Sequence, residues 1–229
     1  TLLGGLRLEN TNTKVRGRVL VDGVLEPEEQ SNDYLAWLPS LHVTFRPASD
    51  TNIRFAATRS FARPDFGDIA PGGAFSEADL EFTGGNPQLK PTYSTNLDLS
   101  FEHYFGKVGL ISAGAFYKRI TDPVFDARRI GSFRGIDGIA FLTPDNGPAG
   151  SLYGFEITAQ SQFDFLPGAL ASLGIHANYT SVNGDDAFDD AGDPSVNQFA
   201  LLGLSDSANV ILMYENFGVS VRVAYNWRD

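Results

Sequence analysis

The side chains best suited to holding a ligand gather in one short segment. Guanidinium groups donate planar hydrogen bonds and stack on rings, and a phenylalanine ring offers an apolar face. Binding residues also concentrate on loops carried by a rigid scaffold. A loop that only packs its own side chains together would use the same residue types, so the sequence leaves both interpretations open. The candidate ligand-binding residues are Phe125, Asp126, Arg128, Arg129 and Arg134.

Groups for catalysis or for a resident metal are scarce. The chain has no Cys and three His, so thiol nucleophiles and thiolate ligands are absent and a His-rich metal site is not expected. Carboxylates such as Glu102 and Glu156 would suit glycoside hydrolysis if two of them flanked a bound sugar, but no second motif supports this reaction. We expect no enzymatic activity, no metal site and no cofactor.

A separate acidic run has no Lys or Arg beside it, and its carboxylates can hold Ca²⁺ or other bridging cations. The spacing of a helix-loop-helix calcium site fails, because Val196 occupies the position that requires Glu when counting begins at Asp185. We therefore interpret the run as solvated loop charge. Its members are Asp185, Asp186, Asp189, Asp190 and Asp193.

The overall charge excludes one class of partner. The chain has 17 Lys and Arg against 28 Asp and Glu, a net charge of -11. This balance repels phosphate backbones, and no stretch collects the cations into a basic stripe. We expect no nucleic-acid partner. The longest mostly apolar run, residues 108–117, is also too short for a membrane-spanning helix, which needs about 20 residues.

Apolar and polar residues alternate along several segments, which is the two-residue period of a strand with one apolar face. Val219, Val221 and Val223, for example, alternate with Ser220 and Arg222. No segment shows the spacing of an amphipathic helix. The chain is therefore predicted to be all-β with about nine strands. They fall in residues 6–9, 41–46, 53–61, 95–102, 108–120, 153–164, 172–180, 208–214 and 219–228.

The connections between these strands alternate between short and long. The short ones are residues 47–50, 105–107, 165–168 and 216–218, and the long ones are residues 17–39, 62–92, 121–150 and 183–200. Compact soluble domains seldom carry several loops longer than about 15 residues. Strands of about 11 residues, tilted near 45°, span roughly 25 Å, which is the apolar band of a membrane barrel.

These features predict an antiparallel transmembrane β-barrel segment with short periplasmic turns and long extracellular loops. A soluble β-sandwich would show the same alternation with its polar face in water. Strand length, loop asymmetry and the aromatics at strand ends favour the barrel. In a barrel the polar face lines the lumen. The side chains expected there are Glu102, Glu156, Gln160, His176, Arg222 and Arg228.

Several motifs follow one another along the chain. Residues 59–66 read Arg-Ser-Phe-Ala-Arg-Pro-Asp-Phe, residues 85–91 read Gly-Asn-Pro-Gln-Leu-Lys-Pro, and residues 96–105 read Asn-Leu-Asp-Leu-Ser-Phe-Glu-His-Tyr-Phe. Shorter matches continue to Tyr-Asn-Trp-Arg at residues 225–228. Their order and spacing resemble the barrel of TonB-dependent outer-membrane receptors, from about residue 4 to residue 228. Within the second motif, the Gly-Gly-Asn-Pro run at residues 84–87 is interpreted as a turn and not as a phosphate-binding loop.

The resemblance implies an active transport receptor in the outer membrane of a Gram-negative bacterium. It takes up a scarce nutrient, and the branch that these motifs resemble favours an oligosaccharide or other organic compound over a ferric siderophore. The implied partners are the TonB energy-transducing complex, reached through an N-terminal segment, the receptor's own plug domain, and outer-membrane lipid with its lipopolysaccharide. A passive porin, or a soluble β-rich binding or adhesive module, are the alternatives.

Two departures from the family pattern stand out. Thr92 and Tyr93 follow Pro91, where the family usually carries an acidic residue. The chain also shows no plug and no closing barrel strand. We therefore expect residues 1–229 to be part of a single receptor barrel domain whose plug and closing strands are absent.

Overall fold

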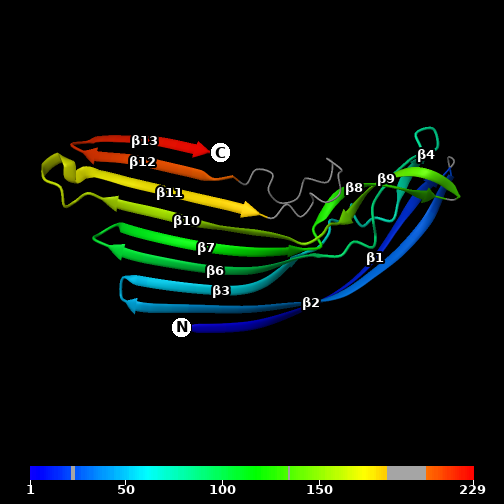
Figure 1. The fold of residues 1–229 in the computed structure, drawn as a ribbon, viewed down its shortest axis with the longest axis horizontal. Coiled ribbons are helices and arrows are strands. Elements are labelled where there is room, and N and C mark those ends of the chain that lie inside the picture. Colours follow the sequence, from blue (N-terminus) through cyan, green and yellow to red (C-terminus); the bar gives the residue numbers. More distant parts are fainter. Residues whose placement is uncertain (22–23, 134, 185–204) are drawn as a thin grey trace.

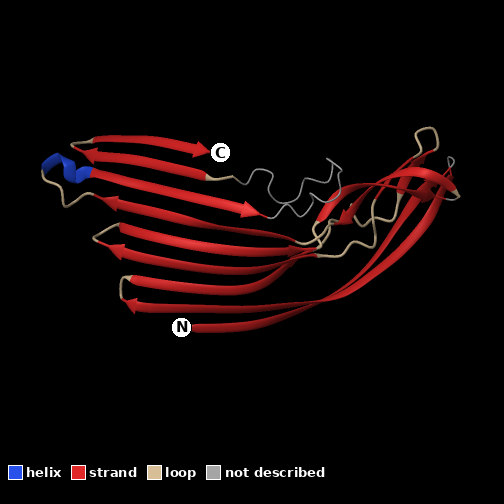
Figure 2. Cartoon of the chain, viewed as in Figure 1, coloured by secondary structure: helices blue, strands red, loops and turns tan. Residues whose placement is uncertain are grey.

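The computed structural model describes residues 1–229 apart from 22–23, 134 and 185–204 (Figure 1). Within this described part, 13 strands form one sheet in the order β13-β12-β11-β10-β7-β6-β3-β2-β1-β4-β5-β9-β8. A five-residue 3₁₀ turn, Gly168–Ser172, is the one helical segment described (Figure 2). No helix among the described residues is long and apolar enough to cross a membrane. The acidic run predicted at residues 185–193 lies outside the described residues.

Nine strands build a long curved sheet and confirm the nine that the alternation predicts. They are β1 (Leu2–Val21), β2 (Val24–Ala48), β3 (Thr51–Ala62), β6 (Thr92–Phe105), β7 (Gly109–Thr121), β10 (Gly150–Gln162), β11 (Leu173–Gly184), β12 (Ser207–Asn216) and β13 (Val219–Arg228). Neighbours in this set pair antiparallel. We define the wall as these nine strands, leaving out residues 10–35 of β1 and β2. The sheet is open, with β13 and β8 at its edges.

The register separates an apolar face of the wall from a polar face. Leu99 lies opposite Phe55 on β3 and opposite Ala115 on β7, which in turn lies opposite Phe155 on β10. Residues that lie directly opposite each other share a face of the sheet. This row is therefore apolar across four strands, and Leu99 is 52% exposed. The next row, which contains Ser100, faces the other way.

The connections are sorted between the two ends of the wall. The turns after β2, β6, β10 and β12 lie together at one end, and the connections after β3 and β7 lie at the other (Figure 1). Gly106 has φ 57° and Gly218 has φ 75°, a left-handed conformation that residues other than glycine adopt at a cost. Both glycines therefore suit the short turns in which they lie.

The prediction of a long loop at residues 17–39 is wrong. β1 and β2 pair without interruption from Leu2 and Val43 to Val21 and Val24, so the hairpin extends far beyond the wall. Cross-strand ion pairs support this extension, since Lys14 and Arg16 both bind the carboxylate of Glu29. Polar residues occupy both faces there, so the alternation that marks a one-sided strand is missing from the sequence.

The expected long loops at residues 62–92 and 121–150 each contain a hairpin. β4 (Gly73–Ser76) pairs with β5 (Glu81–Gly84), and β8 (Val124–Phe133) pairs with β9 (Ile136–Asn146). Two short parallel contacts, β1 with β4 and β5 with β9, join these hairpins to the sheet. We define the cap as the described residues within 10–35, 63–91 and 122–149.

The cap has a small hydrophobic core of its own. Phe82 and Ile139 are buried there, and Phe75, Phe133, Ile136 and Phe141 pack against them. The ring centroids of Phe82 lie 5.3 Å from Phe133 and 5.5 Å from Phe141. Each residue comes from one of the strands β4, β5, β8 and β9, so none of these strands buries its apolar side alone.

The segment of residues 85–91 fastens the parts of the cap together, and it forms the turn that the sequence predicts. Asn86 Nδ2 donates to the carbonyl of Pro144 at 3.1 Å, and Asn32 Nδ2 donates to the carbonyl of Leu89 at 3.0 Å. Leu89 itself is 1% exposed. The segment thereby connects the β1–β2 extension to the β8–β9 hairpin.

A second amide completes this connection at the foot of the β8–β9 hairpin. Asn146 Nδ2 donates to the carbonyls of Lys90 at 3.0 Å and Asp122 at 2.9 Å, while its Oδ1 accepts from the Lys90 backbone N–H at 2.8 Å. Asn146 therefore satisfies three backbone groups at the junction of wall and cap.

Candidate binding cleft in the cap

A cleft of about 500 Å³ lies in the cap between the β1–β2 extension and the β8–β9 hairpin. Glu28 and Gln30 line it from β2, and Arg129 and Phe141 line it from β8 and β9. The turn of residues 85–88 and Phe82 line it as well, as do Ile130, Gly131 and Thr143 of the hairpin. The cleft thus combines two phenylalanine rings with a carboxylate, an amide and a cation, contributed by segments far apart in the sequence.

Arg129 is the cation of this cleft, and its charge is paired. Its guanidinium forms an ion pair with Asp145, whose side chain is 15% exposed, whereas the Arg129 side chain is 64% exposed. The paired residues share one face of the hairpin, because Phe125 lies opposite Asp145 and Arg129 lies opposite Phe141. Asp145 therefore holds the guanidinium beside the cleft while leaving most of the side chain accessible.

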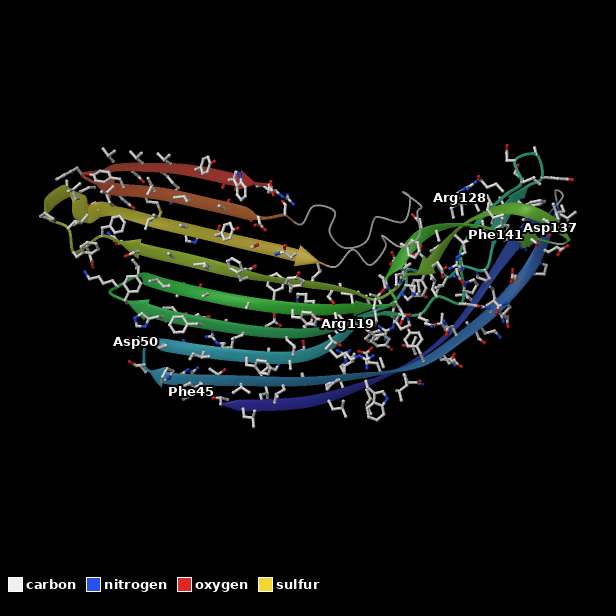
Figure 3. The ribbon with its side chains drawn as sticks, in the orientation of Figure 1. Phe45, Asp50, Arg119, Arg128, Asp137 and Phe141 are labelled. Atoms are coloured by element: carbon white, nitrogen blue, oxygen red, sulfur yellow. The ribbon has the colours of Figure 1, made fainter. Side chains whose placement is uncertain are left out.

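The hairpin divides the candidate residues that the sequence groups together. Phe125 and Arg129 lie on the face that carries Phe141, whereas Asp126 and Arg128 lie opposite Pro144 and Leu142 on the other face. Figure 3 shows Arg128 and Phe141 among the side chains of the cap. Arg134 lies outside the described residues. The described candidates therefore do not form one cluster, because alternate residues of a strand point to opposite sides.

A second cavity, of about 260 Å³, lies between the β1–β2 extension and residues 63–69. Arg63 at its edge donates to the carboxylate of Glu9 at 2.6 Å. This hydrogen bond is the largest effect that raises the pKa of Arg63 above its ordinary value. Val15, Phe66, Ile69, Leu89 and two prolines line this cavity together with the polar residues Thr13, Asn32, Tyr34, Arg63 and Asp65.

All six side chains that we expect in the lumen lie on the polar face of the wall. Gln160 lies opposite His176, Glu156 opposite Thr180, Arg222 opposite Met213 and Arg228 opposite Ser207. Glu102 forms an ion pair with Arg54 and accepts a hydrogen bond from the Tyr104 hydroxyl at 2.9 Å. Their role as a lumen lining stays a prediction.

Several residues of the cleft are missed by the sequence reasoning. Glu28 and Gln30 fall in a segment expected to be a loop, and Phe82, Gln88 and Phe141 carry no motif of a known site. One signal was available for the hairpin. Ile139, Phe141 and Thr143 alternate with Ala140 and Leu142, but apolar residues on both sides weaken the pattern.

The cleft suits a polar organic molecule. Phenylalanine rings can pack against the apolar face of a ring-shaped ligand, while the Gln30 and Gln88 amides can both donate and accept hydrogen bonds. The carboxylate of Glu28 can accept from hydroxyl or amino groups. A mostly apolar hollow with a few polar groups that fix orientation is the usual composition of a small-molecule site.

Comparison with protein families gives a match over the whole chain. The family model described as "TonB dependent receptor-like, beta-barrel" matches residues 1–229. No curated protein sequence shows a significant match.

Solved structures with the same fold are receptors and transporters. The siderophore receptor PirA from Pseudomonas aeruginosa is 14% identical with a TM-score of 0.62, over 97% of this chain and 38% of its own. The hemophore receptor HasR from Serratia marcescens, solved with its hemophore HasA and heme, is 15% identical with a TM-score of 0.66, over 99% and 41%. The copper transporter OprC is 17% identical with a TM-score of 0.68, over 98% and 32%. The chain thus spans about a third to two fifths of the length of these proteins.

Proposed function

The chain belongs to the TonB dependent receptor-like β-barrel family, and from this membership we propose that it forms part of the wall and external loops of an active transport receptor in a bacterial outer membrane. The short turns then face the periplasm and the cap stands outside the cell. The receptor would work with TonB and with its own plug domain, which the polar face of the wall would surround.

One observation carries this proposal. The wall shows a continuous apolar face and a polar face, and its connections are sorted into short turns at one end and a cap at the other (Figure 1). A sheet in lipid must turn apolar side chains outward and pair its backbone groups between strands. The same sheet in water would expose Leu99, Phe101 and Ile157 without benefit.

For the nutrient we propose an oligosaccharide or another polar organic compound in preference to a ferric siderophore. The support is the composition of the cleft, where Phe141 offers a ring face next to the largely buried Phe82, and Gln30 and Gln88 offer amides. The siderophore receptor, the hemophore receptor and the copper transporter share the fold at 14–17% identity. At this identity, the ligands of those proteins are not assigned to this chain.

Uptake by intact cells tests the transport proposal. Cells that carry the full-length receptor should accumulate the cognate nutrient, and deletion of TonB should abolish accumulation while surface binding remains. The reason is that binding energy at one face cannot drive release against a gradient without a state biased by an outside energy source. Uptake that persists without TonB and rises linearly with external concentration would instead establish a passive porin.

A panel of nutrients with two matched variants tests the proposed substrate class. Oligosaccharides and ferric siderophores are offered at equal concentration to cells with the receptor and to cells with Gln30→Ala or Ser31→Ala. Gln30 lines the cleft, whereas Ser31 follows it on the opposite face of β2. Oligosaccharide binding that weakens several-fold only in Gln30→Ala supports the proposal. Binding restricted to ferric siderophores contradicts it.

A further inference from the structure

Three rows of residues cross the outward face of the wall where it meets the cap. The lowest consists of Ala57, Leu97, Tyr117 and Tyr153, each directly opposite the next. The middle row consists of Arg59, Thr95, Arg119 and Ser151. The uppermost contains Phe61, Tyr93 and Thr121. Moving toward the cap, a row with two tyrosines is thus followed by a row with two cations and then by a row with two further aromatic rings.

Arg59 and Arg119 are held in this row and are not neutralised by their neighbours. The Arg59 guanidinium lies 4.4 Å from the centroid of the Tyr93 ring, a position that attracts a cation to the ring face. Arg119 is exposed and lies at the end of the wall nearest the cap (Figure 3). Neither guanidinium forms an ion pair with a carboxylate within the part of the chain that the structure describes.

The spacing of the two cations suits one shared anion. Arg59 on β3 and Arg119 on β7 are separated only by Thr95 on β6, so their Cα atoms are about 10 Å apart, twice the spacing of neighbouring strands. Extended arginine side chains reach across half this distance. Thr95, which is exposed between them, can add a hydroxyl donor.

From this arrangement we propose that Arg59, Thr95 and Arg119 bind the phosphate of a phosphorylated lipid in the outer leaflet. Guanidinium forks match phosphate oxygens in charge and geometry. The apolar row beneath them, which includes Leu97 and Tyr117, packs against the acyl chains of the same lipid. The inference rests on the outer-membrane placement proposed above, and it adds a lipid site that is independent of the nutrient.

A lipid phosphate fits better than a free phosphate ion for two reasons. The cations face outward, away from the polar face and from the cleft, so an ion bound here would not lie on a path into the lumen. A lipid also contributes its acyl chains to the apolar rows below, whereas a free ion gains only the contacts of the middle row. The cation row lies between two rows that carry aromatic rings near the cap end of the apolar face, and aromatic belts of this kind lie at the level of the lipid headgroups.

Lipid retention by the purified full-length receptor tests the site. The receptor is reconstituted into phosphatidylcholine nanodiscs with either diphosphorylated lipid A or the same lipid A without phosphates, and the retained lipid is measured by native mass spectrometry. The wild type should retain the phosphorylated form in preference. The double variant Arg59→Gln/Arg119→Gln should lose at least tenfold of that preference, since a single charge-assisted hydrogen bond is already worth roughly this factor. Lys107→Gln, which removes one cation from a turn at the other end of the wall, should leave the preference unchanged.

A conservative variant keeps the test independent of folding. Arg119→Lys retains the charge but not the planar fork, so it should lose less of the preference than Arg119→Gln. Equal losses in these two variants, with an intact barrel, would overturn the proposal. Equal retention of both lipids by the wild type would overturn it as well, as would full competition by millimolar inorganic phosphate. A receptor that enters no bilayer at all would contradict the proposed function, whereas a receptor that inserts but ignores the phosphates would contradict this inference alone.

Discussion

The wall and the cap are made of the same kind of strand, but they bury their apolar side chains in different ways. The buried apolar residues described in the chain are Ala36, Ile69, Phe82, Leu89, Ala127, Ile139 and Ala140, and all but Ala36 belong to the cap. The wall instead presents large apolar side chains such as Leu99, Phe155 and Val223 on its surface. The cap thus resembles a small domain built for water, whereas the wall requires an apolar solvent.

This difference shows which interactions hold each region. The wall strands of 10 to 14 residues depend on continuous backbone ladders, which are most valuable where no water competes for the hydrogen bonds. The cap depends on its phenylalanine core and on side-chain amides such as Asn86 and Asn146. Substitutions should therefore have effects that depend on the region and on the face of the strand.

The largest effect is expected in the core of the cap. Ile139→Ala in the full-length receptor removes a side chain that is 0% exposed, and it should lower the free energy of opening the cap by about 2 to 5 kcal/mol. Hydrogen exchange should report this loss at the amides of β8 and β9 and leave those of β6 and β7 unchanged. The matched control is Ile130→Ala, which truncates a side chain that is 64% exposed. Equal losses in both variants would show that the cap has no separate core.

The next effect separates the two faces of the wall. Leu99→Arg places a charge on the apolar face and should cost about 2 to 4 kcal/mol near the middle of the bilayer. Ser100→Arg, at the adjacent position, faces the other way and should cost little. Unfolding titrations in lipid bilayers measure both. Equal penalties, or the reverse order, would contradict the orientation of the wall.

A smaller effect is expected at the junction of the two regions. Asn146→Ala leaves the Lys90 and Asp122 backbone groups without the partners that the amide supplies, and it should loosen the foot of the β8–β9 hairpin by about 1 to 3 kcal/mol. Hydrogen exchange at the Lys90 amide checks this prediction. Asn12→Ala on the exposed face of the β1–β2 extension serves as the control. An equally large change in exchange at the Lys90 amide in this variant would show that Asn146 has no special role.

The smallest effect concerns pH and the β1–β2 extension. Hydrogen bonds from Lys14 and then Arg16 lower the pKa of Glu29 below its usual value. A carboxyl whose pKa falls on folding stabilises the folded state above its unfolded pKa, and this contribution disappears as the pH falls through the folded pKa. Amide protection in residues 14–31 should therefore decrease below about pH 4. In Glu29→Gln the same amides should show no such dependence, and an identical decrease there would assign it to another group.

The wall could be predicted from the sequence, whereas most of the cap could not. One-sided burial gives the wall strands a two-residue period, so Val219, Val221 and Val223 already show which side is apolar. The strands of the two cap hairpins acquire their core only when Phe75, Phe82, Phe133 and Phe141 meet, and each of these residues comes from a different strand. No pattern within a single strand predicts these contacts between strands.

The candidate site shows the same limit. Arg129 lies beside a cavity, but the residues that line this cavity with it, Glu28 and Gln30, come from a hairpin extension that is polar on both faces and that the sequence predicts as a loop. Asp126 and Arg128 belong to the other face of β8. When residues are assigned to a loop, the sequence does not predict which way each side chain points. It could therefore group these residues because they are close along the chain, but it could not assign them to different faces of a strand.

The depth of individual side chains in the membrane tests the difference between wall and cap most directly. The chain has no Cys, so single substitutions Leu99→Cys, Ser100→Cys and Ile130→Cys in a cysteine-free full-length receptor can each carry one fluorophore in lipid bilayers. Brominated acyl chains should quench the label at position 99 but not at position 100, and aqueous iodide should quench the label at position 130. Quenching at position 99 by iodide, with none by the brominated lipid, would contradict a wall that faces lipid.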